Sequence, residues 1–158
     1  MQTFEPWTIE RVIENLESLP SYEQQDVFND LAHQKTELSQ ALTKAIKNTE
    51  GLATLNCAII LLKLQAKAGR DVFLQMFSSL DEERASHALS ALSSELAPQD
   101  SHSISKFSYQ TKIPLTGKEI FNAIQHLLLE PESVLGSAAL FVCLKHNIEA
   151  SYSITLLC

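Results

Sequence analysis

Glycine and proline are scarce in this sequence, with four and five copies among 158 residues. Folds rich in hairpins, tight turns or phosphate-binding loops need more of both, because glycine supplies positive φ angles and proline fixes turns. The glycines are also isolated from one another, so the sequence has no glycine-rich nucleotide loop. This scarcity indicates a fold built from helices joined by short connections.

Long apolar runs and an excess of basic residues are missing as well. The sequence has no run of 18 apolar residues, and residues 1–7 lack the basic and apolar parts of a signal peptide. Twelve basic against nineteen acidic residues give a formal net charge of −7, which argues against a dedicated nucleic-acid-binding protein. We therefore expect a cytoplasmic protein with no membrane and no nucleic-acid partner.

Catalytic and metal-binding patterns are lacking too. Cys57, Cys143 and Cys158 form no CxxC pair, and the five histidines form no HxxxH or HExxH motif. The sequence therefore predicts reduced cysteines and no catalytic residue, metal or cofactor. The rival interpretation is a helical enzyme subunit or small-ligand carrier with an interhelical pocket around His87 and His126.

Apolar residues recur at the spacing of a helix along most of the chain. A first helix is predicted over residues 9–19, and Ser21 with Gln24 forms a capping-box pattern at the start of a second. The period across residues 22–48 fits one long helix or two, and we favour a break near residues 33–36.

Six further helices follow from the same period and from cap residues. Asp81 is a good N-cap, Thr116 with Glu119 is a second capping-box pattern, Pro131 suits a first helical turn, and Gly69 suits a helix end. The predicted ranges are 52–67, 71–77, 81–96, 116–128, 134–145 and 148–158.

These elements predict an all-α fold in a single domain, residues 1–158. Between residues 98 and 115 we expect at best a short extended segment. The domain divides into acidic N-terminal helices (1–35), two helical hairpins (36–97), a long serine-rich loop (98–115) and C-terminal helices (116–158).

Three of the predicted helices share an apolar pattern, at residues 58–62, 88–92 and 139–143. The first two begin 30 residues apart, and the larger gap before the third is explained by the serine-rich loop. Two helices per unit at such a period are typical of an α-solenoid, in which each unit buries its apolar face on its neighbours.

The segment from Asp81 to Leu92 resembles the second helix of a HEAT or armadillo-type repeat, through its opening Asp81, its Arg84 and its small residues Ala88 and Ala91. This resemblance implies an α-α superhelix of helical hairpins. An irregular six- to seven-helix bundle, with small residues where helices cross, explains the same sequence pattern and stays open as an alternative.

The basic residues are concentrated in one region, because residues 1–30 sum to −6 whereas residues 35–70 sum to +4. Three of them are spaced i, i+4 and i+7, which places them on one helical face, and two belong to the preceding helix. We predict that they form a basic strip for an acidic or phosphorylated segment of a protein partner. The strip consists of Lys44, Lys47, Lys63, Lys67 and Arg70.

The serine-rich loop adds Lys106, Phe107 and Tyr109 as candidate contact residues, because loops of this length are usually functional or disordered. The chain closes on the apolar residues 154–158, without the polar face of a capping repeat, which predicts self-association or a docked partner there. Together these features predict a non-catalytic protein-interaction or scaffold module that binds through a helical groove or face.

Overall fold

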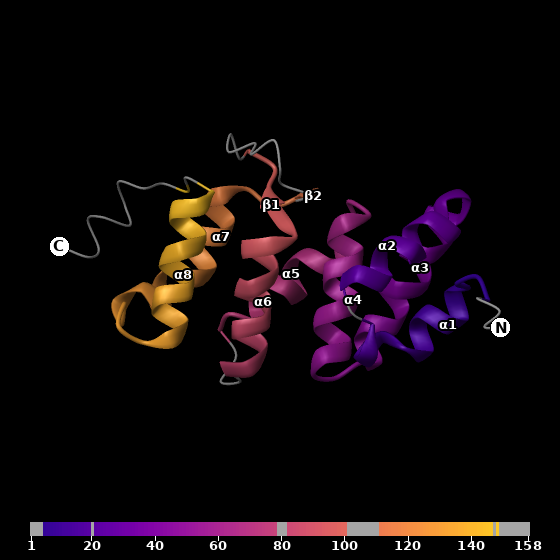
Figure 1. Ribbon diagram of the computed structural model, residues 1–158, viewed down its shortest axis with the longest axis horizontal. Coiled ribbons are helices and arrows are strands. Elements are labelled where there is room, and N and C mark those ends of the chain that lie inside the picture. The colour runs from indigo at the N-terminus through magenta and orange to yellow at the C-terminus, as the bar shows by residue number, and fades with distance from the viewer. Residues whose placement is uncertain (1–4, 20, 79–81, 101–110, 147, 149–158) are drawn as a thin grey trace. The chain divides into compact units, whose positions relative to one another are not determined.

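The chain is described from a computed structural model (Figure 1). The structure describes residues 5–19, 21–78, 82–100, 111–146 and 148, and the backbone alone at residues 21 and 22. The chain divides into two compact units, Met1–Gly69 and Arg70–Cys158, and each is described by itself. Helices dominate the described residues of both, which agrees with the predicted all-α class.

The first unit contains helices α1 to α4 with three short 3-10 helices between them. Their bounds are α1 (Ile9–Glu14), η1 (Leu16–Ser18), α2 (Ser21–Asp30), η2 (Ala32–Gln34), α3 (Lys35–Ala45), η3 (Ile46–Asn48) and α4 (Leu52–Lys63). Because η2 separates α2 from α3, the favoured break within residues 22–48 is confirmed. The Thr8 hydroxyl caps α1 by accepting a hydrogen bond from the backbone N–H of Arg11.

Helix α4 forms the centre of the first unit. It packs against η1 and α3, and α3 also contacts α1. A helix in contact with several neighbours must be apolar on more than one side. Its buried residues are Leu55, Cys57, Ala58, Ile59, Ile60, Leu61 and Leu62.

The end of α4 differs from the sequence prediction. The helix stops at Lys63, and Gln65 takes the left-handed conformation with φ of 62°. The backbone N–H of Ala66 donates to the Leu61 carbonyl at 2.9 Å, and that of Gln65 to the Leu62 carbonyl at 3.0 Å. This is the hydrogen-bond pattern of a Schellman motif, completed here by a residue other than glycine.

Gly69 is therefore not the cap of this helix, and that prediction was wrong. It lies in α5 (Ala68–Gln75). A Cβ atom at Gly69 would lie 2.8 Å from the Ala58 carbonyl oxygen and 2.9 Å from the Leu61 Cβ. The glycine is required because the backbone comes close to α4 at this point.

The second unit contains the rest of α5 and three further α-helices among its described residues. The other elements are α6 (Glu82–Ser94), β1 (Leu96–Pro98), β2 (Thr111–Ile113), α7 (Gly117–Ile124), η4 (Gln125–Leu129) and α8 (Val134–Lys145). Helix α6 packs against α8, and η4 packs against both α7 and α8. The rings of Phe73 and Phe77 meet edge to face at a centroid distance of 5.4 Å.

The two strands form a small parallel sheet in which Leu96 pairs with Thr111 and Pro98 with Ile113. The sequence predicted helix at residue 96 and at best an extended segment beyond it. All three residues of β1 are buried, so their backbone groups need partners, and the strand pairing supplies them. The Thr111 N–H also donates to the Glu95 carbonyl at 2.8 Å.

The caps of α7 and α8 had different outcomes. The capping box at α7 is confirmed, because the Thr116 hydroxyl accepts from the Glu119 N–H while the Glu119 carboxylate accepts from the Thr116 N–H. At α8 the cap is Ser133, whose hydroxyl accepts from the Gly136 N–H at 2.9 Å. Pro131 lies before this cap and outside the helix, so its predicted first-turn position was wrong.

Gly136 lies where α8 passes close to the chain that precedes it. A Cβ atom there would overlap the carbonyl of Glu130 and lie 2.8 Å from the carbonyl oxygen of Leu127. The close neighbours are therefore backbone atoms of η4 and of the connection between η4 and α8.

Some predictions concern residues that the structure does not describe. These are the helix-opening role of Asp81 and the helix over residues 148–158, of which Ile148 alone is described. Within the described ranges, no helix combines the length and apolarity that crossing a membrane requires.

Candidate protein-binding surfaces

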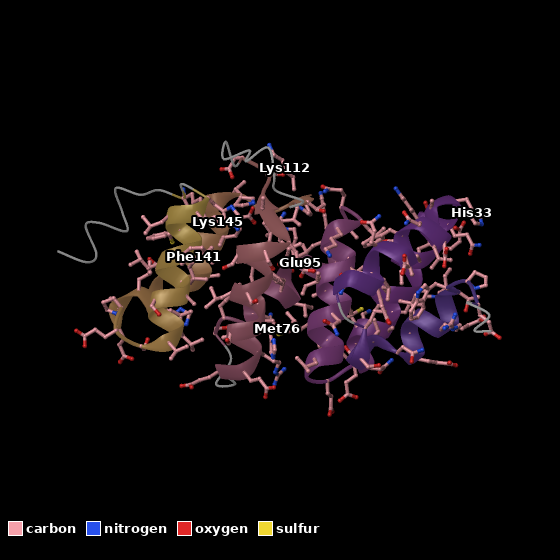
Figure 2. All side chains as sticks on the ribbon, in the orientation of Figure 1. His33, Met76, Glu95, Lys112, Phe141 and Lys145 are labelled. Carbon is pink, nitrogen blue, oxygen red and sulfur yellow. The ribbon has the colours of Figure 1, made fainter. Side chains whose placement is uncertain are left out.

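An exposed, largely apolar stripe runs along α8. Val134, Ser137, Phe141 and Leu144 are spaced i, i+3, i+7 and i+10, which places them on one side of the helix, and all four are exposed. The apolar three are 80%, 55% and 59% exposed respectively, and Phe141 is labelled in Figure 2. We call these four residues the α8 surface.

The opposite side of α8 is buried against α6 and η4. Ala139, Val142 and Cys143 are fully buried on that side. Apolar residues surround α8 on all sides, but its neighbours cover only one of them. Large apolar residues are normally buried, so three of them exposed along one stripe require an explanation.

Two polar contacts at the end of α8 fix its rotation about its own axis. The Lys145 ammonium donates to the Ser93 carbonyl, and His146 Nε2 is hydrogen-bonded to the Leu92 carbonyl. Both carbonyls belong to the last turn of α6. Because these contacts hold the inner side of α8 against α6, the α8 surface faces outward.

His146 acts in this arrangement as a neutral donor. It is 3% exposed, and burial lowers the pKa of its imidazole below the ordinary value of 6.5. The hydrogen bond to Leu92 opposes that shift, and the positive charge of Lys145 adds to it. A neutral imidazole that donates its Nε2–H to the Leu92 carbonyl caps the end of α6 without burying a charge.

The start of α8 is acidic. Glu130 and Glu132 are exposed in the connection from η4, together with Leu129, which is 69% exposed. This connection lines a hollow of about 540 Å³ formed by residues 129–133. The two ends of α8 therefore differ in charge, with carboxylates before its first turn and Lys145 in its last.

The first unit has a hollow of its own beside α1, with a volume of about 360 Å³. Its lining residues are Pro6, Trp7, Thr8, Ile9, Glu10, Asp30, Leu31, His33 and Gln34. The backbone N–H of Trp7 donates to the Asp30 carboxylate at 2.8 Å. The Arg11 guanidinium lies 4.6 Å from the Trp7 ring centroid and donates to the carbonyls of Glu5 and Pro6. These contacts fix the chain that enters α1.

Among the predicted basic residues, Lys44, Lys47 and Lys67 are exposed. Lys63 is half-buried, and its ammonium donates to the Gln24 side-chain oxygen at 2.9 Å, while it lies 6.0 Å from the Phe28 ring centroid. Gln24 is 1% exposed, so this contact satisfies a buried acceptor between α2 and α4.

Arg70 belongs to the second unit, where its guanidinium forms an ion pair with Glu119. The same carboxylate closes the α7 capping box, so this arginine holds α5 to the start of α7. Lys63 and Arg70 thus have roles inside their own units. The predicted placement of Lys63, Lys67 and Arg70 on one helical face was wrong, because α4 ends at Lys63 and Arg70 lies in α5. Partner binding by the basic strip stays a prediction, and Lys106, Phe107 and Tyr109 lie outside the described residues.

The two histidines of the rival interpretation lie on α6 and η4. The His87 side chain is 51% exposed and lies 3.8 Å from the Glu83 carboxylate, one turn earlier in α6. His126 Nε2 is 2.8 Å from the Phe77 carbonyl oxygen. Each thus has a partner in its surroundings. Within the described parts of the chain, no three metal-ligating side chains are grouped around a possible ion site.

Sequence reasoning missed the α8 surface because it treated residues 139–143 as one more buried core. The signal that points to it is the apolar character of α8 on every side. No protein-family model, curated protein or solved structure matches this chain.

Proposed function

We propose that this chain is a non-catalytic protein-interaction module that contacts a protein partner through the α8 surface. The observation that supports this proposal is the exposure of Val134, Phe141 and Leu144 on a helix whose rotation is fixed by Lys145 and His146. Exposed apolar side chains held in a rigid row give binding energy at low entropic cost, and an aromatic ring is a frequent anchor.

The proposal includes the α-solenoid architecture and a cytoplasmic scaffold role. Its support is that the repeated segments of α4, α6 and α8 each contribute buried residues to their own unit, and that α6 and α8 pack directly together. In such an architecture each helix buries one side on its neighbours, and a side left uncovered is available to a partner. The basic residues Lys44, Lys47 and Lys67 would then steer a partner with an acidic segment.

Site-specific photo-crosslinking tests this function. A benzophenone amino acid replaces Phe141, and the full chain is illuminated in lysate of its native host, with the captured polypeptide identified by mass spectrometry. The matched control carries the same group at Asn122, an exposed position on α7. We expect a discrete product at position 141 and none at 122. Equal labelling at both positions, or none at position 141, contradicts the proposal.

The alternative of a small-ligand carrier has one supporting observation, the hollow beside α1. Trp7 offers an aromatic edge there, and Asp30 and His33 offer polar groups. A carrier would release a small molecule on denaturation of the protein purified from its host, detectable by mass spectrometry. Loss of that molecule in a Trp7→Ala variant would favour the carrier function over protein binding.

A further inference from the structure

The spacing of residues on the α8 surface is self-complementary, and from it we infer that its occupant is a second copy of this chain, packed antiparallel. This inference rests on the proposed function, because it names the partner of the same surface. A dimer with a two-fold axis requires each patch to fit itself, with residue i facing residue j and j facing i.

An axis level with residue 139 meets that requirement. Val134 of one copy then faces Leu144 of the other, and the large Phe141 faces the small Ser137, because both pairs of positions lie symmetrically about 139. A large side chain opposite a small one allows two helices to interdigitate closely. The two copies therefore form two Val134–Leu144 contacts and two Phe141–Ser137 contacts across the axis.

Charge favours the antiparallel arrangement over the parallel one. Glu130 and Glu132 are exposed just before α8. Antiparallel helices keep these carboxylates of the two copies at opposite ends of the interface and also oppose the helix dipoles favourably. Parallel helices would place all four carboxylates side by side at one end.

The size of the surface indicates a weak dimer. A stable interface buries on the order of 800 Å² per partner, whereas an exposed apolar patch on a monomer covers only about 300–600 Å². Four residues of one helix lie at the lower end of that range. The mass of the full chain should therefore rise with concentration across the micromolar range. Phe141→Ser should weaken the association by roughly tenfold or more, since loss of one aromatic anchor has effects of that size.

Disulfide trapping tests the register directly. In a Cys158→Ser background, Val134→Cys and Leu144→Cys are made as separate full-length variants, one of them with an affinity tag. Under mild oxidation we expect the mixture to form the mixed disulfide dimer at least tenfold faster than either variant alone. The pair Asn122→Cys with Leu144→Cys is the control and should crosslink slowly. Circular dichroism checks that these surface variants remain folded.

Three outcomes would overturn the inference. Val134→Cys that crosslinks with itself as fast as with Leu144→Cys contradicts the antiparallel register. A wild-type monomer at all concentrations that dimerises only after removal of residues 149–158 shows that the chain's own C-terminal segment covers the surface. A monomer in both forms, combined with capture of a different polypeptide at position 141, refutes self-association while leaving the proposed function standing.

Discussion

The substitution Gly136→Ala tests the close approach between α8 and the connection before it. In an open helix, alanine in place of glycine stabilises by about 1 kcal/mol, because it removes conformational freedom from the unfolded chain. Here the new methyl group would overlap the Glu130 carbonyl and lie 2.8 Å from the Leu127 carbonyl oxygen. Both obstacles are backbone atoms, which cannot rotate away as a side chain does.

Overpacking costs about 1–3 kcal/mol, and a rigid backbone neighbour places this site at the upper end. Subtracting the gain of about 1 kcal/mol from a cost of about 3 kcal/mol leaves a net destabilisation of about 2 kcal/mol. With a urea dependence of about 1–3 kcal/mol per molar, the unfolding midpoint should fall by about 1 M. Circular dichroism at 222 nm during urea titration of the full chain measures this shift.

The matched control is Ser137→Ala, at the next position in α8. Ser137 is exposed, so the variant gains helix propensity without meeting a neighbour, and its stability should be equal to or slightly above that of the wild type. A Gly136→Ala variant as stable as Ser137→Ala would refute the reasoning, because it would mean that the connection yields to a methyl group at no cost.

Three further predictions concern protonation, thiol access and helix capping. Burial lowers the pKa of His146 below 6.5, so its contribution to stability is complete above pH 6.5 and declines as the pH falls below that value. Between neutral and mildly acidic pH, the urea midpoint of His146→Gln should therefore fall less than that of the wild type. Burial raises the pKa of Cys57 to about 12, and Cys143 is also buried, so a Cys158→Ser variant should react with a chromogenic disulfide reagent only after unfolding; rapid reaction in native buffer contradicts this. Thr116→Ala should lower the free energy of unfolding by about 1 kcal/mol while Thr116→Ser stays near wild type in the same urea titration, because only serine retains the capping oxygen.

Local signals predicted much of the secondary structure. The break after α2 and the capping box at Thr116 depend on a few neighbouring residues, so sequence alone was sufficient. The end of α4 was predicted wrongly because a glycine after a helix has two explanations. It can supply a positive φ angle or allow a close approach, and Gly69 does the second while Gln65 accepts the first.

Features that depend on distant contacts could not be predicted in the same way. Strands of three residues are too short to show alternation, so β1 and β2 gave no periodic signal. Helices α4 and α8 are similarly apolar, yet α4 is buried on most sides and α8 leaves one side exposed. The difference arises from the number of elements that pack against each helix, and the sequence of the helix itself does not determine that number.

The parallel pairing of β1 and β2 has a consequence for how this chain can change during evolution. Parallel strands need a connection of about a dozen residues, and residues 99–110 supply about that minimum. Deletions here would pull the strands apart, whereas doubling the connection adds only about 0.6 kcal/mol of closure entropy. Hydrogen bonds on both sides, from Thr111 to Glu95 and from Gln99 to Leu115, keep the ends in place. The connection should thus tolerate insertions but not deletions, which makes it a suitable position for an inserted peptide or affinity tag.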